Sequence, residues 1–154
     1  MATTAIPTEL AAARERNEAI WRQSSTSLYD NRIDEFLAYW HEDARYEVAY
    51  PIGDFPAVVE GRAALGELFA SFAAASERLE VHDVRFHQTD DPQVAFVEER
   101  MVAELVGGGR YENRLVIRVT FRDGLIAEMC EYYGQRAHEE LLVRLGVVAA
   151  RSAS

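Results

Sequence analysis

Four strand-like segments follow one another in the second half of the chain, each joined to the next by a turn signal. The segments read "LEVHDVRFHQ", "QVAFVEERMVAELV", "RYENRLVIRVTF" and "LIAEMCEYY", and "TDDP", "GGG" and "RDG" separate them. The last turn is a strong hairpin signal, because Gly124 tolerates positive φ. Strands joined by short hairpins pair antiparallel with their neighbours. The sequence therefore predicts a meandering antiparallel sheet over residues 79–133.

Helical patterns occupy most of the first half of the chain. Apolar residues recur at helical spacing from Thr8 to Leu28, over 33–40 and over 62–76, and a closing amphipathic helix is expected at about 137–145. Short strands are expected at 44–51 and 57–61. Helices followed by hairpin-linked strands are typical of an α+β fold, in which the N-terminal helices cover one face of the sheet.

Length and charge limit the classes of protein that this chain can belong to. Its 154 residues suit one domain, expected at 8–146 between flexible tails at 1–7 and 147–154. A formal net charge of −10 opposes binding to nucleic acids and to anionic membranes. Cys130 is the only cysteine, which fits a reducing compartment, and neither a secretory signal nor a membrane span is evident. A cytoplasmic protein is expected.

Strand alternation predicts which side chains face the helices. In 111–122, one face holds tyrosine, asparagine and four large apolar residues, and the other holds charged residues. The apolar face is expected inward, so Asn113 is a polar exception there. In 125–133, Glu131 shares one face with Met129 and Tyr133, and Glu128 lies on the other face, so alternation leaves open which of the two acids points inward. In the strand predicted at 93–106, Glu99 shares a face with apolar residues and is a second candidate inward acid.

Inward carboxyl groups are candidates for acid–base chemistry. Burial raises the pKa of a carboxyl group, and a group tuned close to neutrality can donate and recover a proton. Glu131 is the first candidate, and its alternative is a structural ion pair with an arginine. Glu99 could be a second acid, although its place in the run "EER" favours a partly exposed residue. Asn113 could bind a substrate carbonyl, or it could be structural.

Aromatic residues with polar ends could line a pocket beside these acids. Trp40, Tyr46, Tyr50 and Tyr111 would suit a planar, oxygenated ligand, although core packing explains such residues equally well. Phe55 lies in a loop rich in proline and glycine, where it could cover the mouth of the pocket.

No metal or cofactor is predicted. His41 and His138 are expected on the surface near helix ends, while His82 and His87 are expected on opposite faces of one strand. Zinc-ligand spacings and glycine-rich nucleotide-binding motifs are not found in the sequence.

Two longer phrases resemble the SnoaL-like branch of the NTF2-like superfamily: "HEDARYEVAYPIGDFPAVVEGRAAL" at 41–65 and "FRDGLIAEMCEYYG" at 121–134. The resemblance implies a cone, a curved, mostly antiparallel sheet wrapped around N-terminal helices. "TDDPQVAFVE", "YENR", "DGLIAEMCEYYGQ" and "ELLVRLGV" are similar to phrases of the PhzA/PhzB phenazine-biosynthesis group. In that group an acidic residue of the last strand acts as acid and base, which implies this role for Glu131.

The resemblance also indicates differences from these relatives. The histidine and serine that the phenazine group uses on its third helix correspond to Leu68 and Phe72 here, which implies a different substrate. Ketosteroid isomerase, a distant relative, has its catalytic aspartate where this chain has Tyr50. Because a tyrosine is a poor base at neutral pH, Tyr50 could only donate a hydrogen bond to a substrate oxygen.

Together these features predict a cofactor-free cyclase, isomerase or dehydratase of bacterial secondary metabolism, acting on a cyclic or polyketide-like small molecule. Glu131 would move the proton, and Tyr50 or Asn113 would hold an oxygen. A non-catalytic ligand-binding or scaffold protein is the alternative. An epoxide hydrolase is a further alternative, but the Asp–Arg–Asp trio of that reaction is not evident on the inward faces. A homodimer is expected through the outer sheet face, which carries Arg114, Arg118 and Arg122.

Overall fold

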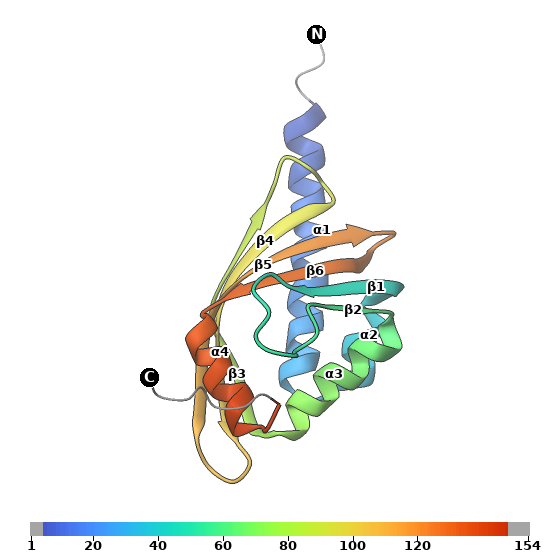
Figure 1. The fold of residues 1–154 in the computed structure, drawn as a ribbon. Coiled ribbons are helices and arrows are strands. Elements are labelled where there is room, and N and C mark those ends of the chain that lie inside the picture. The colour runs from blue at the N-terminus through green and yellow to red at the C-terminus, as the bar shows by residue number, and fades with distance from the viewer. Residues whose placement is uncertain (1–4, 148–154) are drawn as a thin grey trace.

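The computed structural model describes residues 5–147, which form a curved sheet with helices around its concave side (Figure 1). The elements in chain order are α1 (Ala5–Tyr29), α2 (Ile33–Ala38), β1 (Trp40–Val48), β2 (Val58–Glu60), α3 (Arg62–Ala74), β3 (Ser76–Gln88), β4 (Val94–Leu105), β5 (Arg110–Arg122), β6 (Leu125–Tyr133) and α4 (Gln135–Arg144). The six strands lie in the order β2-β1-β6-β5-β4-β3. Only the β1–β6 pair is parallel, so the predicted mostly antiparallel sheet is confirmed.

The strands β5 and β6 form where alternation and turn chemistry agree. Every second side chain of β5, from Tyr111 to Phe121, is buried, as predicted. Asp123 and Gly124 connect the two strands with φ values of 55° and 74°. Two central residues with positive φ are the requirement of a type I′ turn, whose twist matches that of the flanking strands. This turn pairs Arg122 with Leu125, and a bulge between Thr120 and Phe121 then sets the register in which Ile117 lies opposite Glu131.

Element boundaries differ from prediction at the N-terminal side of the fold. The helix predicted over 33–40 ends at Ala38, because Trp40 instead begins β1 and lies opposite Ile126 of β6. The amide of Ile126 donates to the carbonyl of Tyr39 at 2.8 Å, which fixes this change of direction. Helix α1 begins at Ala5, earlier than the predicted Thr8. The outer parts of the predicted tails, residues 1–4 and 148–154, lie outside the described residues.

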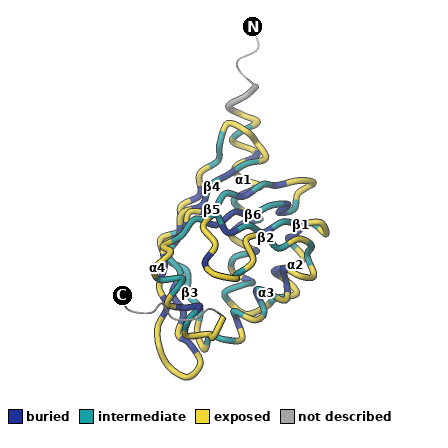
Figure 2. Tube along the Cα trace, in the orientation of Figure 1, coloured by how far each residue is buried: buried dark blue, intermediate teal, exposed yellow. Residues whose placement is uncertain are grey.

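The core lies between the inner face of the sheet and helices α1 to α3. Figure 2 shows buried stretches along β4, β5 and β6, whereas the hairpin between β4 and β5 is exposed. Phe36 and Phe69 meet edge to face at 5.0 Å between ring centroids, and Trp40 packs on Phe36. Burial of such apolar surface is the main stabilising contribution to the fold.

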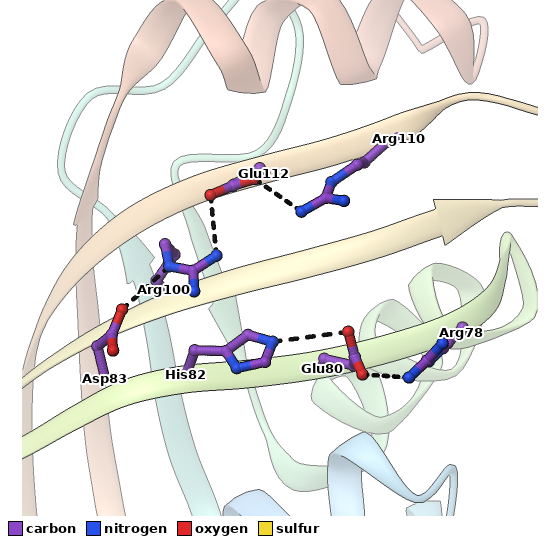
Figure 3. A network of polar contacts seen from close by, with 7 residues as sticks. All are labelled: Arg78, Glu80, His82, Asp83, Arg100, Arg110 and Glu112. Carbon is purple, nitrogen blue, oxygen red and sulfur yellow. Dashed lines mark hydrogen bonds and ion pairs between the residues drawn. The ribbon is translucent and has the colours of Figure 1, made fainter.

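The outer face of the sheet is polar and carries ion pairs within the chain (Figure 3). Arg100 contacts Asp83 at 3.0 Å and Glu112 at 2.9 Å. His82 belongs to the same face, opposite Arg100, and His87 lies opposite Phe96 on that face. The prediction that the two histidines face opposite ways is therefore wrong. A bulge between His82 and Arg85 inserts a residue and restores the same facing.

No helix within the described residues is both long enough and apolar enough to span a membrane.

Candidate active site

Two adjoining compartments lie inside the cone. The main compartment, of about 350 Å³, lies between α3, α4 and the sheet. The inner compartment, of about 40 Å³, lies between α1 and the sheet. Both are mostly apolar, and they share four lining residues: Phe69, Phe72, Met101 and Glu131. Glu131 is therefore in contact with both spaces.

Glu131 lies in the middle of β6, with Val48 of β1 and Ile117 of β5 on either side. Its side chain points inward and is 9% exposed. Tyr46 donates a hydrogen bond from Oη to Oε2 of Glu131 at 2.7 Å. No other hydrogen bond or ion pair to this carboxyl group exists among the described residues, so Oε1 is available to a ligand. The predicted inward position is confirmed, and the alternative of an arginine ion pair is wrong.

Burial determines the proton affinity of Glu131. Removal from water raises its pKa from 4.5 to about 7, and the Tyr46 hydrogen bond acts in the opposite direction. At neutral pH both protonation states are then populated. A group in this condition can take a proton from a ligand and return it without a large energetic penalty.

Glu99 is a second buried acid, on the inner face of β4. It is 7% exposed and lines the inner compartment. Tyr29 of α1 donates a hydrogen bond to Oε1 at 3.4 Å, while Oε2 is buried without a partner. Burial, and secondarily the negative charge of Glu131, raises the pKa of Glu99 to about 8. The expected partial exposure is therefore wrong, because Glu99 follows Val97 on the face that packs against the helices.

His138 was missed as a site residue, since it was expected on the surface. Helix α4 begins at Gln135, and its first turn places His138 over the main compartment. Its ring lies 4.4 Å from that of Tyr133 and meets Phe55 edge to face at 5.4 Å. Burial lowers the pKa of His138 to about 4, so the imidazole is neutral at pH 7. Its spacing of three residues from the buried Leu141 was the signal that could have indicated this inward position.

Most of the predicted substrate-binding residues line the cavity. Met129 lines the inner compartment. The main compartment is lined by Tyr46, Phe55, Leu68, Phe72, Tyr111 and Tyr133. Leu68 and Phe72 are apolar at the positions where the resemblance implies polar helpers in the phenazine group, and Ser71 is the polar residue of α3 in the lining.

The structure places two predicted residues elsewhere. Tyr50 lies two residues beyond the end of β1, is 53% exposed and packs against Tyr132 on the outer side of the sheet. Alternation does not continue past Val48, because the chain leaves the sheet there, so Tyr50 cannot hold a substrate oxygen in the cone. Trp40 is fully buried against Phe36 and lines neither compartment.

Asn113 is buried as predicted, but its amide is occupied. Its Nδ2 donates to Tyr111 Oη at 2.9 Å and to the Gly134 carbonyl at 3.0 Å. Its Oδ1 accepts from the Gly134 amide at 2.9 Å. A Cβ atom at position 134 would lie 2.8 Å from Oδ1, so glycine permits this close approach. Asn113 therefore fixes the junction of β6 and α4, and both hydrogens of its amide are already donated within the chain. The catalytic role expected for it stays a prediction.

Buried polar atoms without a partner concentrate at the cavity. Of five such side-chain atoms among the described residues, four belong to residues lining the two compartments: Trp21 Nε1, Glu99 Oε2, Tyr133 Oη and His138 Nε2. Buried polar groups in folded proteins are nearly always paired. Their concentration here indicates a ligand-binding cavity, and no group of three His, Cys, Asp or Glu residues suited to a metal occurs within 5–147.

A curved sheet closed by helices is the cone class of α+β proteins, and in this chain an inward acid lies on the last strand. The profile of the SnoaL-like domain matches residues 21–129, well over half of the 154-residue chain. The chain therefore belongs to the SnoaL-like domain family, as the two sequence phrases indicated. No curated protein matched the sequence.

Solved structures share the fold at low sequence identity. A proposed isomerase from Bacillus subtilis superposes with a TM-score of 0.78 at 17% identity, covering 88% of this chain and 96% of that one. A phenazine biosynthesis-related protein from Pseudomonas aeruginosa gives 0.71 at 18% identity, covering 96% of each chain. A Mycobacterium tuberculosis protein in complex with estradiol-17β-hemisuccinate gives 0.71 at 21%, covering 79% of this chain and 96% of that one. These likenesses establish an NTF2-like fold.

Proposed function

We propose that the protein is a cofactor-free acid–base enzyme that cyclises, isomerises or dehydrates a cyclic, oxygenated small molecule of bacterial secondary metabolism. The position and proton affinity of Glu131 carry this proposal. It is a buried carboxyl group with one hydrogen bond, no ion pair and a pKa of about 7, at the contact of two apolar compartments. The relatives described as an isomerase and as a phenazine biosynthesis-related protein agree with this class of chemistry.

Proton transfer by Glu131 can be written for a ligand that carries a carbonyl group. The carboxylate removes a proton from the carbon next to the carbonyl. The electron pair of the broken C–H bond forms a C=C bond, and the π pair of the carbonyl moves to the oxygen, which gives an enolate. Tyr133, whose Oη is buried and unpartnered, can donate to that oxygen. Protonated Glu131 then returns the proton to another carbon, or to a departing hydroxyl group. Imine formation on a lysine is not open to this chain, whose 154 residues include no lysine.

A simple ketone can test this chemistry without knowledge of the natural substrate. The probe 2-tetralone has acidic protons beside its carbonyl, and their exchange in D₂O is followed by ¹H NMR. We expect exchange faster than in buffer for the unchanged protein and at the buffer rate for Glu131→Gln. The control variant is Glu104→Gln, an exposed glutamate of β4, which should exchange as the unchanged protein does. Exchange that persists in Glu131→Gln would remove this residue from the mechanism.

A non-catalytic binding protein is the second candidate. The apolar Leu68 and Phe72 favour it, because they give the cavity no further proton-transfer group on the α3 side. It predicts that 2-tetralone binds with equal affinity to the unchanged protein and to Glu131→Gln, with no exchange in either. The homodimer and the cytoplasmic location remain predictions, to be tested by sedimentation equilibrium and by cell fractionation.

A further inference from the structure

The inner compartment holds two polar atoms that the proposed proton transfer does not use. Trp21 Nε1 comes from α1 and Glu99 Oε2 comes from β4, on opposite walls of the compartment. Both side chains are more than nine-tenths buried, with exposures of 5% and 7%. The indole N–H can only donate, and a carboxyl oxygen can accept or, when protonated, donate.

The carboxyl group of Glu99 is held in place from one side only. Tyr29 donates to Oε1, which leaves Oε2 as the oxygen without a protein partner. Leaving a buried polar group unsatisfied costs about 1–3 kcal/mol. A ligand atom that pairs with both Trp21 and Glu99 would remove this cost at two groups at once, which favours a ligand with an oxygen at this point.

The volume of the inner compartment limits what can enter it. At about 40 Å³ it exceeds the roughly 10–15 Å³ that a cavity needs to hold one water molecule. It is therefore large enough for one oxygen-bearing substituent, and it is much the smaller of the two compartments. The main compartment, at about 350 Å³, is large enough for the ring system itself.

We propose that the inner compartment is a subsite for one carbonyl or hydroxyl oxygen of the ligand, bound between Trp21 and Glu99. A carbonyl oxygen accepts from the indole N–H and from the protonated Glu99 carboxyl, whereas a hydroxyl accepts from Trp21 and donates to Glu99. The ring then lies in the main compartment beside Glu131. This assignment rests on the proposed function for the site and narrows the substrate class to rings with an oxygen at the buried edge.

The two tryptophans of the chain provide a direct readout. In protein labelled with ¹⁵N-tryptophan, each indole gives one N–H signal, and Trp21→Phe assigns them. We expect 2-naphthol to move the Trp21 signal downfield, as a new hydrogen bond does, and to leave the signal of Trp40 in place, because Trp40 lines neither compartment. The size-matched 2-methylnaphthalene should bind without this downfield shift and at least about fivefold more weakly.

Variants separate this subsite from the catalytic proposal. Glu99→Met keeps a similar length and is expected to abolish the preference for 2-naphthol, while Glu104→Met, on the exposed face of the same strand, should retain it. In Glu131→Gln the Trp21 shift should persist, even though 2-tetralone exchange is lost. A Trp21 signal that does not respond to saturating 2-naphthol, or equal affinities for the two probes, would overturn the subsite whatever the exchange assay gives. If Glu99→Met does not fold, the response of the unchanged protein decides.

Discussion

Replacing Glu131 with glutamine should stabilise the protein at high pH and leave its stability unchanged at low pH. Burial raises the pKa of this carboxyl from 4.5 to about 7 in the folded state. Below pH 4.5 both the folded and the unfolded chain carry the protonated group, so the carboxyl behaves like an amide. As pH rises, Glu131 ionises first in the unfolded chain, so the free energy of unfolding falls. The fall ends when Glu131 ionises in the folded state as well, at about pH 7.

The size of the effect follows from the pKa difference. At 1.36 kcal/mol per pKa unit, a rise from 4.5 to about 7 corresponds to about 3 kcal/mol in the free energy of unfolding above pH 7. For a chain of 154 residues this corresponds to a melting temperature about 6–12 °C higher for Glu131→Gln at about pH 8. The glutamine oxygen can still accept the hydrogen bond of Tyr46, so the substitution removes the ionisation and keeps the contact.

The assay is urea unfolding of both proteins at intervals between about pH 4 and pH 9, followed by circular dichroism. The difference in free energy of unfolding should be near zero at the low end, grow between pH 4.5 and about 7 and then level off. Glu104→Gln, at an exposed strand position, should give a difference that does not depend on pH. A flat difference for Glu131→Gln would show that this carboxyl is solvated in the folded state, and the acid–base proposal would lose its physical basis.

Three further outcomes are expected. Tyr46→Phe removes the hydrogen bond that lowers the pKa of Glu131, so the midpoint of its carboxyl ¹³C titration should move upward, and a downward move would contradict the contact. Asn113→Ala leaves the amide and carbonyl of Gly134 unpaired. The free energy of unfolding, measured with urea, should fall by about 1–3 kcal/mol. No loss would mean that solvent replaces these bonds. His138 should stay neutral at pH 5.5 by NMR, because burial lowers its pKa from 6.5 to about 4. As pH falls from 6.5 to about 4, the imidazole is protonated in the unfolded chain but not in the folded one, so the free energy of unfolding should fall. A protonated ring at pH 5.5 would show that His138 is in contact with water.

The strands that carry the site were predictable from local pattern. β6 spans Leu125–Tyr133, as the sequence indicated, because its alternation lies between a clear turn and a helix-starting glycine. Alternation alone left Glu128 and Glu131 on opposite faces without deciding which faces inward, and the resemblance implied Glu131. The position of Glu99 was harder to predict, because the charged Glu98 and Arg100 on either side of it suggest an exposed segment. The helices that pack on one face of β4 bury Glu99 and leave the other two outside.

The remaining site residues depended on where elements end. Trp40 and Tyr50 were both expected in the cavity, but Trp40 begins β1 in the core and Tyr50 follows the end of that strand. His138 is in the cavity because α4 starts two residues earlier than expected and folds its first turn back over the sheet. Such end points are set by tertiary contacts, which a local pattern does not contain.

The type I′ turn at Asp123 and Gly124 has a consequence for the acid seven residues beyond it. A bulge between Thr120 and Phe121 lies between this turn and Glu131, so the turn and the bulge together decide the register. Because side chains alternate between the two faces of a strand, a slip of one residue at either point would turn Glu131 toward water and bring Cys130 and Tyr132 into the interior. A bulky residue at position 124, where φ is +74°, would favour such a misalignment. Damage from that change would therefore resemble loss of the acid itself, although the carboxyl group would still be present in the chain.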